Sequence, residues 1–191
     1  MILQDVFDEI KNLTGKEDDE IDDDESKILD AINRAQKIIA TAVFPIRNSV
    51  TVTQEETGAV HQHDLSTLFS GKYMGIDKIV RIHDEKYYAD VGYALEGGKY
   101  LVLPDLPGTF TIYYSMKPTK YTADTNKETT EIELSENVST LLPIYAAYFY
   151  QLNDDNELAT ALQNYYEDVK KEILSHMDEA KAPEREIIYG L

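Results

Sequence analysis

The fold is decided by the stretch Gly108-Thr-Phe-Thr-Ile-Tyr-Tyr-Ser-Met-Lys-Pro118, in which apolar and polar residues alternate as in a β-strand. A polar loop follows it. Two segments, Leu141–Leu152 and Glu157–Leu174, then carry apolar residues at helical spacing. Strand periodicity therefore gives way to helix periodicity over a short length of chain. Nothing in this part of the sequence resembles an active site, so it predicts a building block rather than a catalytic centre.

The two C-terminal helices are expected to form a helix hairpin within residues 138–180. Pro143 suits the first turn of the first helix, and Asp154 followed by Glu157 forms a capping-box pattern at the start of the second. The linker between the helices is short, which favours an antiparallel hairpin or a sharply kinked pair. The predicted buried faces consist of Leu142, Tyr145, Tyr148, Phe149 and Leu152 on the first helix and Leu158, Leu162, Tyr165, Val169 and Ile173 on the second.

Residues 48–121 contain short β-branched or aromatic runs that are separated by turn signals. Runs of this kind at close, regular spacing predict a small antiparallel β-sandwich or barrel. The clearest hairpin joins Val91–Glu96 to Lys99–Leu103, because Gly97-Gly98 can supply the positive φ angles of a tight turn.

Two further helices are predicted in the N-terminal part of the chain, residues 1–44. The first begins near Ile2 and ends at Thr14-Gly15. The second runs from about Ser26 to Val43 and is ended by Phe44-Pro45, because proline disfavours helical geometry in the residue before it.

Between these two helices, residues 17–25 hold eight carboxylates in nine positions. A calcium loop of the EF-hand type would need glycine at its sixth position and glutamate at its twelfth. Counted from Asp18, those positions hold Asp23 and Leu29, and a start at Asp19 fails as well. We interpret the run as a solvated connection whose last acids favour the positive end of the next helix.

The predicted fold class is α+β, in a single domain over residues 1–191. A small antiparallel β-sandwich or barrel region is flanked by an N-terminal helix pair and a C-terminal helix hairpin. The predicted parts are N-terminal helices with an acidic link (1–44), a β region (48–121), the helix hairpin (138–180) and an apolar C-terminal tail (183–191).

Composition narrows the function classes. The chain has 36 acidic and 18 basic residues, which gives a net charge of −18. Tight binding to nucleic acid or to an anionic membrane surface needs clustered lysine and arginine, so neither is expected. The sequence contains no cysteine, which excludes disulfides, thiolate metal sites and cysteine nucleophiles. No apolar segment is long enough to suggest a membrane-spanning helix.

Motifs for chemistry are weak. His61-Gln-His63-Asp64 would place two imidazoles on one face of a strand, but no third zinc ligand is nominated, so we interpret it as a solvent-facing polar patch. The glycines between Gly92 and Lys99 have the wrong spacing for a phosphate-binding loop and are followed by a strand. The numerous carboxylates select no catalytic pair. We therefore expect no enzyme activity, no cofactor and no metal.

The order of elements resembles that of head–tail adaptor (connector) proteins of tailed bacteriophages. The likeness covers roughly residues 25–175, and no single motif in it is diagnostic. Departures are the acid run at 17–25 and the size of the β region. The likeness is carried by Asp30-Ala-Ile-Asn-Arg-Ala-Gln36, Gly108-Thr-Phe-Thr-Ile-Tyr-Tyr114 with Lys117-Pro118, Leu142-Pro-Ile-Tyr-Ala-Ala-Tyr-Phe-Tyr150 and Asn164-Tyr-Tyr-Glu-Asp-Val-Lys170.

The resemblance implies a structural virion protein of the phage neck, assembled in the host cytoplasm. It implies a homo-oligomeric ring, usually dodecameric, that joins the portal protein to the stopper or tail and extends the DNA channel. DNA would pass through that channel without specific binding, which agrees with the acidic composition.

The apolar tail after Pro183 is the candidate partner-binding segment, through Ile187, Ile188, Tyr189 and Leu191. Two interpretations of it are open. The tail could dock into the portal or a neighbouring subunit, or it could fold back on its own sheet. Two other function classes are also open. One is a different virion protein, such as a tail-completion protein. The other is a ligand-binding β-sandwich module for carbohydrate or calcium.

Overall fold

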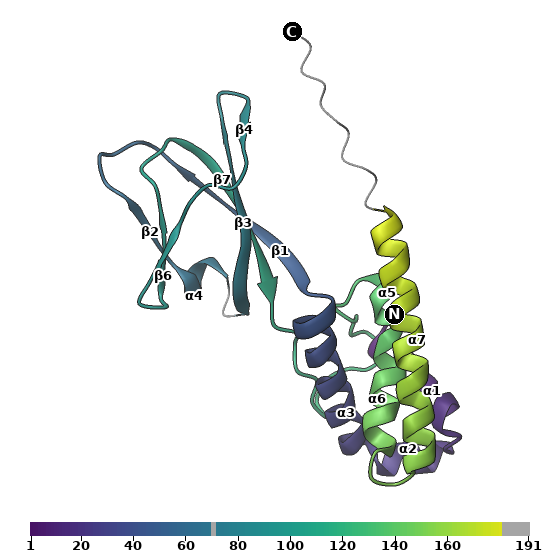
Figure 1. Cartoon of the computed structure of the whole chain (residues 1–191). Helices are drawn as coiled ribbons and strands as arrows, with labels where there is room; N and C mark the ends of the chain where they lie inside the picture. Colours follow the sequence, from purple (N-terminus) through teal and green to yellow (C-terminus); the bar gives the residue numbers. More distant parts are fainter. Residues whose placement is uncertain (70–71, 181–191) are drawn as a thin grey trace. The chain divides into compact units, whose positions relative to one another are not determined.

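The computed structural model describes residues 1–69 and 72–180 (Figure 1). The chain divides into two compact units. The helical unit combines Met1–Ile39 with the chain from Lys120 onward, and the sheet unit is Ala40–Thr119. Helices and antiparallel sheets are both present, with helices from both ends of the chain flanking the sheet region in sequence, so the α+β class is confirmed. That the whole chain acts as a single domain stays a prediction.

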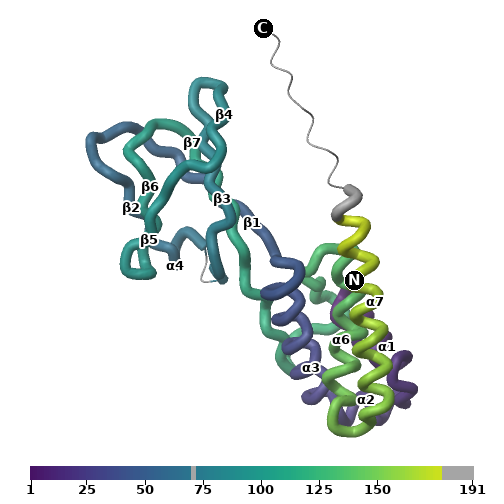
Figure 2. The backbone as a smooth tube through the Cα atoms, in the orientation of Figure 1, coloured from purple at the N-terminus to yellow at the C-terminus, as the bar shows by residue number. Residues whose placement is uncertain are grey.

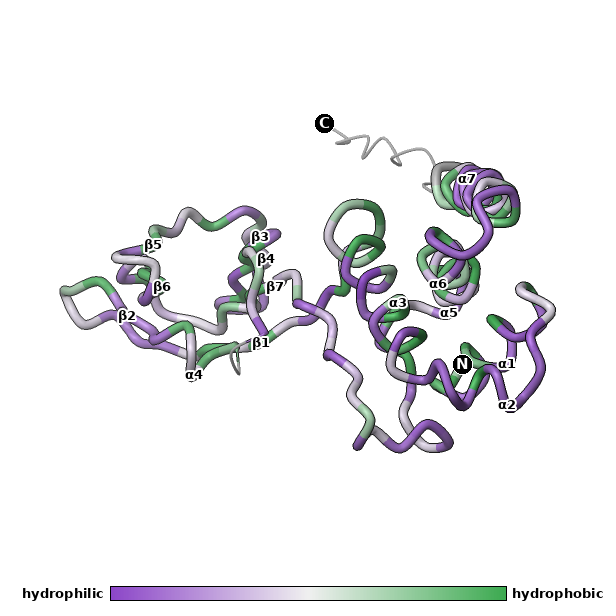
Figure 3. Tube along the Cα trace, turned by 90° about the horizontal axis from the view of Figure 1, so that it is seen from below, coloured by the Kyte–Doolittle hydropathy of each residue, from purple (hydrophilic) through white to green (hydrophobic). Residues whose placement is uncertain are grey.

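The helical unit is built around α6. Its helices are α1 (Leu3–Thr14), α2 (Asp18–Asp23), α3 (Glu25–Ile38), α5 (Glu136–Ser139), α6 (Leu141–Gln151) and α7 (Asn156–Ala180). Helix α6 packs against α1, α3 and α7, and Figure 2 shows α3, α6 and α7 side by side. A helix covered on three sides needs apolar residues on most of its faces, and Figure 3 shows hydrophobic residues mixed with paler ones along α6. Ala146 and Ala147 of α6 are fully buried.

The helix hairpin of α6 and α7 is present, but two details of its prediction are wrong. The side chain that caps α7 is Asp155, not Asp154: its Oδ1 accepts the backbone N–H groups of Glu157 at 3.0 Å and Leu158 at 2.9 Å. On α7 the buried tyrosine is Tyr166, whose ring stacks on Tyr145 at 4.1 Å, whereas Tyr165 is half exposed.

The buried face of α6 also differs from the predicted one. Leu142 is fully buried, as expected. The other four residues of the predicted face are only partly buried: Tyr145, Tyr148, Phe149 and Leu152. The buried residues of α6 are mostly small or aliphatic instead, Ala146 and Ala147 among them, because α6 has three neighbours rather than one.

The acid run is exposed to solvent and connects α1 to α3, as predicted, but it does so as a short helix, α2. Its one apolar residue, Ile21, is buried and anchors it. Glu20 Oε2 accepts the backbone N–H of Glu17 at 3.0 Å, and Lys16 pairs with Glu20 at 3.0 Å. At the end of the run, the hydroxyl of Tyr150 donates to Asp24 Oδ2 at 2.8 Å. Local pairs of this kind offset the repulsion among the carboxylates.

The segment between β7 and α5 is partly buried. Tyr121 is 2% exposed, and Asn33 of α3 holds its backbone at both ends: Nδ2 donates to the Tyr121 carbonyl and Oδ1 accepts the Tyr121 N–H, each at 2.8 Å. Ile2 and Glu131 form an isolated antiparallel bridge. The segment leading to α5 is thus tied to α1 and α3.

The second N-terminal helix ends where the sequence indicates, but in a different form. Helix α3 stops at Ile38, and a π-helical turn, η1 (Ile39–Val43), carries the chain to Val43.

The sheet unit is a small sandwich of two antiparallel sheets. Its elements are β1 (Ile46–Gln54), β2 (His61–Asp64), α4 (Leu65–Leu68), β3 (Tyr73–His83), β4 (Lys86–Tyr88), β5 (Ala94–Glu96), β6 (Tyr100–Leu103) and β7 (Gly108–Met116). The strand orders are β1-β7-β3-β4 and β2-β6-β5. Phe110, Ile112 and Tyr114 of β7 point into the core with Leu101 and Leu103 of β6. The alternation of apolar and polar residues from Gly108 to Met116 thus marks an inner strand of the larger sheet.

The Gly97-Gly98 hairpin is confirmed. Both glycines have positive φ, 58° and 65°, and Lys99 N–H donates to the Glu96 carbonyl at 3.0 Å. The first strand starts at Ala94 rather than Val91, because Val91 N–H donates to the Ile79 carbonyl of β3.

Candidate interaction surfaces

Large exposed apolar side chains gather in each unit. In the sheet unit they include Ile82, Tyr87 and Tyr88, which we call the hairpin surface. In the helical unit they lie on α7, at Tyr165, Leu174 and Met177. Contiguous exposed apolar surface marks contact sites more often than single exposed residues do.

The hairpin surface is presented by a tight turn. Strands β3 and β4 are joined by Asp84 and Glu85, which have φ angles of 48° and 62°. Positive φ at both central residues is the geometry of a type I′ turn, and it costs free energy for residues other than glycine. The turn places Ile82 directly opposite Tyr87, which are 46% and 64% exposed.

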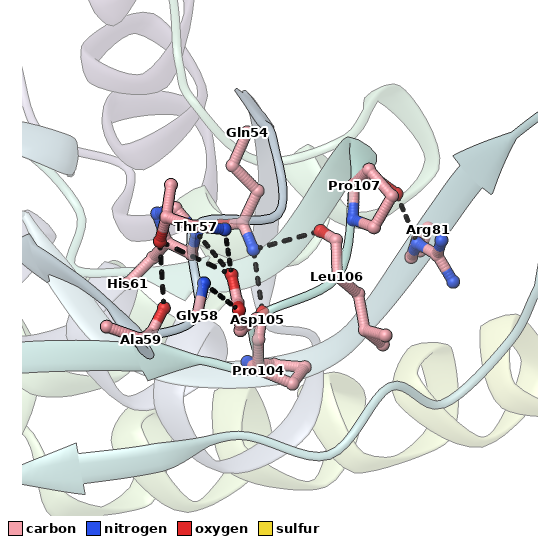
Figure 4. Close-up of polar contacts among 10 residues, drawn as sticks. All are labelled: Gln54, Thr57, Gly58, Ala59, His61, Arg81, Pro104, Asp105, Leu106 and Pro107. Atoms are coloured by element: carbon pink, nitrogen blue, oxygen red, sulfur yellow. Dashed lines mark hydrogen bonds and ion pairs between the residues drawn. The ribbon is translucent and has the colours of Figure 1, made fainter.

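Arg81 holds the base of this hairpin. The residue is only 8% exposed, and its Nε donates to the Pro107 carbonyl at 2.7 Å (Figure 4). Its guanidinium carbon lies 4.9 Å from the ring centroid of Tyr88, a cation–π geometry. Tyr88 is therefore oriented from within the unit while 41% of its surface stays open to solvent.

A second polar group fixes the neighbouring loops, as Figure 4 shows. The Asp105 carboxylate accepts the backbone N–H groups of Thr57 at 2.8 Å and Gly58 at 2.6 Å, and it lies 3.3 Å from His61 Nε2. Gln54 Nε2 donates to the Pro104 carbonyl at 2.7 Å. The amide hydrogen bond from Thr57 is the main cause that lowers the pKa of Asp105. These contacts position loops rather than reacting groups.

The predicted solvent-facing patch of His61 and His63 is wrong. Both histidines are partly buried, His61 pairs with Asp105, and His63 Nε2 is buried with no hydrogen-bond partner in the structure. Over residues 1–69 and 72–180, no group of three or more histidines and carboxylates is placed to hold a metal ion.

His63 should make the sheet unit sensitive to acid. Burial, together with the nearby His61, lowers the pKa of His63 below its ordinary value near 6.5. The folded state therefore binds the proton less readily than the unfolded state, and stability should fall as the pH drops below about 6.5. We expect His63→Gln to flatten the free energy of unfolding between about pH 8 and pH 5, measured by urea titration.

The control for this prediction is His176→Gln, which removes an exposed histidine of α7 and should leave the wild-type slope in place. An unchanged pH dependence in His63→Gln would show that His63 is not the group that titrates.

The apolar side chains of α7 line two adjoining hollows, which we call the α7 groove. One has a volume of about 510 Å³ and includes Ile173 and Met177. The other has a volume of about 300 Å³ and includes Tyr165 and Val169. Thr140 borders both. Carboxylates of Asp5, Glu9, Glu136 and Glu172 also line the hollows.

The residues predicted to bind a partner, Ile187, Ile188, Tyr189 and Leu191, lie outside the described residues, so that assignment stays a prediction. Sequence reasoning missed the hairpin surface because it counted Tyr87 and Tyr88 among ordinary sheet tyrosines. A usable signal was present: the two tyrosines follow a charged turn, Asp84-Glu85, and are adjacent, so at least one of them must lie on the outer face of a strand.

These features place the chain in the class of α+β proteins that expose apolar surfaces suited to protein–protein contacts. The comparison with protein families agrees: residues 1–186 match the family described as SU10 adaptor protein. The chain belongs to this family of phage head–tail adaptors, which confirms the resemblance. It is a structural virion component that interacts with other virion proteins. No curated protein matches the chain.

Within the described ranges, no helix has the length and apolar character needed to cross a membrane.

Proposed function

We propose that the protein forms a homo-oligomeric ring in the virion neck, of the kind that is usually dodecameric in the adaptors it resembles, and joins the portal protein to the stopper or tail. The ring would be assembled in the host cytoplasm and would extend the DNA channel. The observation that carries this proposal is the family match over residues 1–186. Such a role is structural and requires neither catalysis nor a cofactor.

The charge distribution supports the channel role. The net charge is −18, and on α2 and its N-terminal neighbour the exposed carboxylates include those of Glu17, Asp18, Asp19 and Asp22. Like charges repel DNA phosphates, so a wall of this composition lets DNA pass without retaining it.

We also propose that the apolar tail is the segment that docks on the portal. Ile187, Ile188, Tyr189 and Leu191 are four large apolar side chains within five residues. A short segment of this kind gains affinity by burying its side chains in a partner's groove.

Deleting Ile187–Leu191 should abolish portal binding and leave the unfolding midpoint unchanged, because the deletion removes contact side chains and no described core residue. Mass measurement in solution, alone and with the portal protein, checks the binding. The matched control replaces Glu184 and Glu186 by glutamine, which alters the charge beside the apolar residues but keeps them.

Two results would count against these proposals. Normal portal binding by the shortened chain would refute the role of the tail. A wild-type protein that stays monomeric, ignores the portal and binds glycan or calcium instead would refute the adaptor function.

A further inference from the structure

The larger sheet of the sheet unit has two open edges. In the order β1-β7-β3-β4, strands β1 and β4 are outermost, and among the described residues neither has a further strand hydrogen-bonded to its outer side. Strand β1 is nine residues long, and its register with β7 runs without a shift from Ile46↔Met116 to Gln54↔Gly108. It is a long and regular edge.

Beyond Arg47, which pairs with Asp77 at 3.2 Å, the β1 edge lacks the features that usually keep an edge from pairing. Natural sheets protect such edges with charges, prolines or bulges. From Asn48 to Gln54 the strand has no charge, no proline and no glycine. Ser49 N–H donates to the side chain of its own neighbour, Asn48 Oδ1, at 2.8 Å. Seven consecutive edge residues without a charge, Asn48–Gln54, are expected to be covered in the working protein.

Strand β4 is short and exposes two tyrosines beside Lys86. Tyr87 is the most exposed of the large apolar residues, at 64%, and it lies beside Tyr88 and opposite Ile82. Tyrosine is enriched at protein interfaces because it buries a large area at a small cost in side-chain entropy. The hairpin surface thus borders the one edge, and strand β1, which is uncharged from Asn48 to Gln54, forms the other.

The two edges are complementary in direction. Strand β1 is antiparallel to β7, β7 to β3, and β3 to β4, so β1 and β4 run in opposite directions. A second copy related by rotation about an axis roughly along the strands would present its β1 antiparallel to β4 of the first copy. The same antiparallel pattern would then continue from copy to copy.

The registers also define which residues would meet. Thr53, Thr109, Ile82 and Tyr87 form one row across the four strands. Continuing that row places Thr53 of the next copy beside Tyr87. The adjacent row consists of Val52, Phe110, Arg81 and Tyr88. Continuing it would place Val52 of the next copy beside Tyr88. Aromatic residues pair favourably with β-branched residues across antiparallel strands.

We propose that the open edge of β1 in one copy pairs antiparallel with β4 of the next copy, so that the hairpin surface is the contact between subunits. This inference rests on the proposed ring. Each copy donates one edge and receives the other, a heterologous contact that closes into a ring when the rotation between copies permits. A two-fold pairing of β1 with β1 would stop at a dimer and leave Tyr87 uncovered.

The absence of cysteine from the chain makes the contact testable by disulfide trapping. The variant carries Thr53→Cys and Tyr87→Cys, both at exposed positions. Within one copy these positions are separated by three strand spacings, about 14 Å, which is too far for a disulfide. We expect mild oxidation of the full-length protein, alone and with the portal, to give a ladder of covalent species beyond the dimer, which a reductant collapses.

Controls separate the alternatives. Each single-cysteine variant should give no ladder. The pair Thr111→Cys with Tyr87→Cys should give none either, because Thr111 lies on β7 in the interior of the sheet. Dimers from Thr53→Cys alone would indicate a β1–β1 contact and overturn the proposal.

The mass of the wild-type assembly separates the proposed edge contact from the proposed function. Rings that form normally while the Thr53/Tyr87 pair yields no ladder would overturn the edge contact and leave the proposed function standing. A wild-type protein that forms no ring, with or without the portal, would overturn both.

Discussion

Replacing Phe110 by alanine is expected to lower the free energy of unfolding of the sheet unit by about 3–5 kcal/mol. Phe110 is fully buried near the start of β7, where its register neighbours are Val52 of β1 and Arg81 of β3. Truncation would remove the transfer free energy of the ring and leave a cavity between the two sheets. A unit of this size is expected to be stable by roughly 4–12 kcal/mol, so the change is a large share of the total.

Urea unfolding followed by near-ultraviolet circular dichroism suits this test, because the chain has fourteen tyrosines and no tryptophan. The matched control is Thr111→Ala, one residue along the same strand on the opposite face, which should change stability by less than about 1 kcal/mol. Equal effects of the two substitutions would mean that the core does not lie on the Phe110 side of β7.

Strand β7 could be predicted because the pattern that identifies it lies within the strand itself. Alternation along Phe110, Ile112 and Tyr114 identifies one buried face whatever the partner strands are. Its pairing could not be predicted in the same way. Strand β1 pairs with β7 across the whole length of the sheet unit, and no local pattern in either strand names the other. The two open edges, on which the proposed subunit contact depends, follow from this non-local order.

The acidic composition of residues 17–25 prevented the prediction of helix α2. Eight carboxylates in nine positions favour a solvated chain on charge alone, yet α2 is held by Ile21, by Lys16 and by a cap from Glu20. Each is a single residue at the right helical position. Together these contacts stabilise α2 only when the helix also packs against the rest of the helical unit. The sequence does not reveal that packing.

The choice between Tyr165 and Tyr166 shows a second limit. Both tyrosines lie near one apolar stripe of α7. A rotation of the helix by one residue would bury one of them in place of the other. The packing partner decides: Tyr145 of α6 stacks on Tyr166, which leaves Tyr165 in the α7 groove. Tyr165, which the periodicity placed in the core, therefore belongs to a candidate contact surface, the α7 groove.

Gly108→Ala is expected to destabilise the sheet unit by roughly 2–4 kcal/mol, through backbone strain and overpacking together. Gly108 begins β7 with a φ angle of 130°, which residues with a side chain rarely adopt. A Cβ atom added there would lie 2.6 Å from the backbone carbonyl oxygen of Ile82 and 3.1 Å from His83 Cβ. The backbone oxygen cannot rotate aside, so the start of β7 must move away from the end of β3.

The matched control is Gly75→Ala on β3, where an added Cβ meets nothing within 4 Å. Urea unfolding should therefore separate the two variants clearly. Moving β7 away from β3 would also disturb the hydrogen bond from Arg81 to the Pro107 carbonyl, next to Gly108. Amide exchange in the β3–β4 hairpin should accelerate in Gly108→Ala and stay unchanged in Gly75→Ala. If Gly108→Ala were as stable as the control, the close approach of β7 to Ile82 would be contradicted, and with it the geometry that presents Tyr87 at the sheet edge.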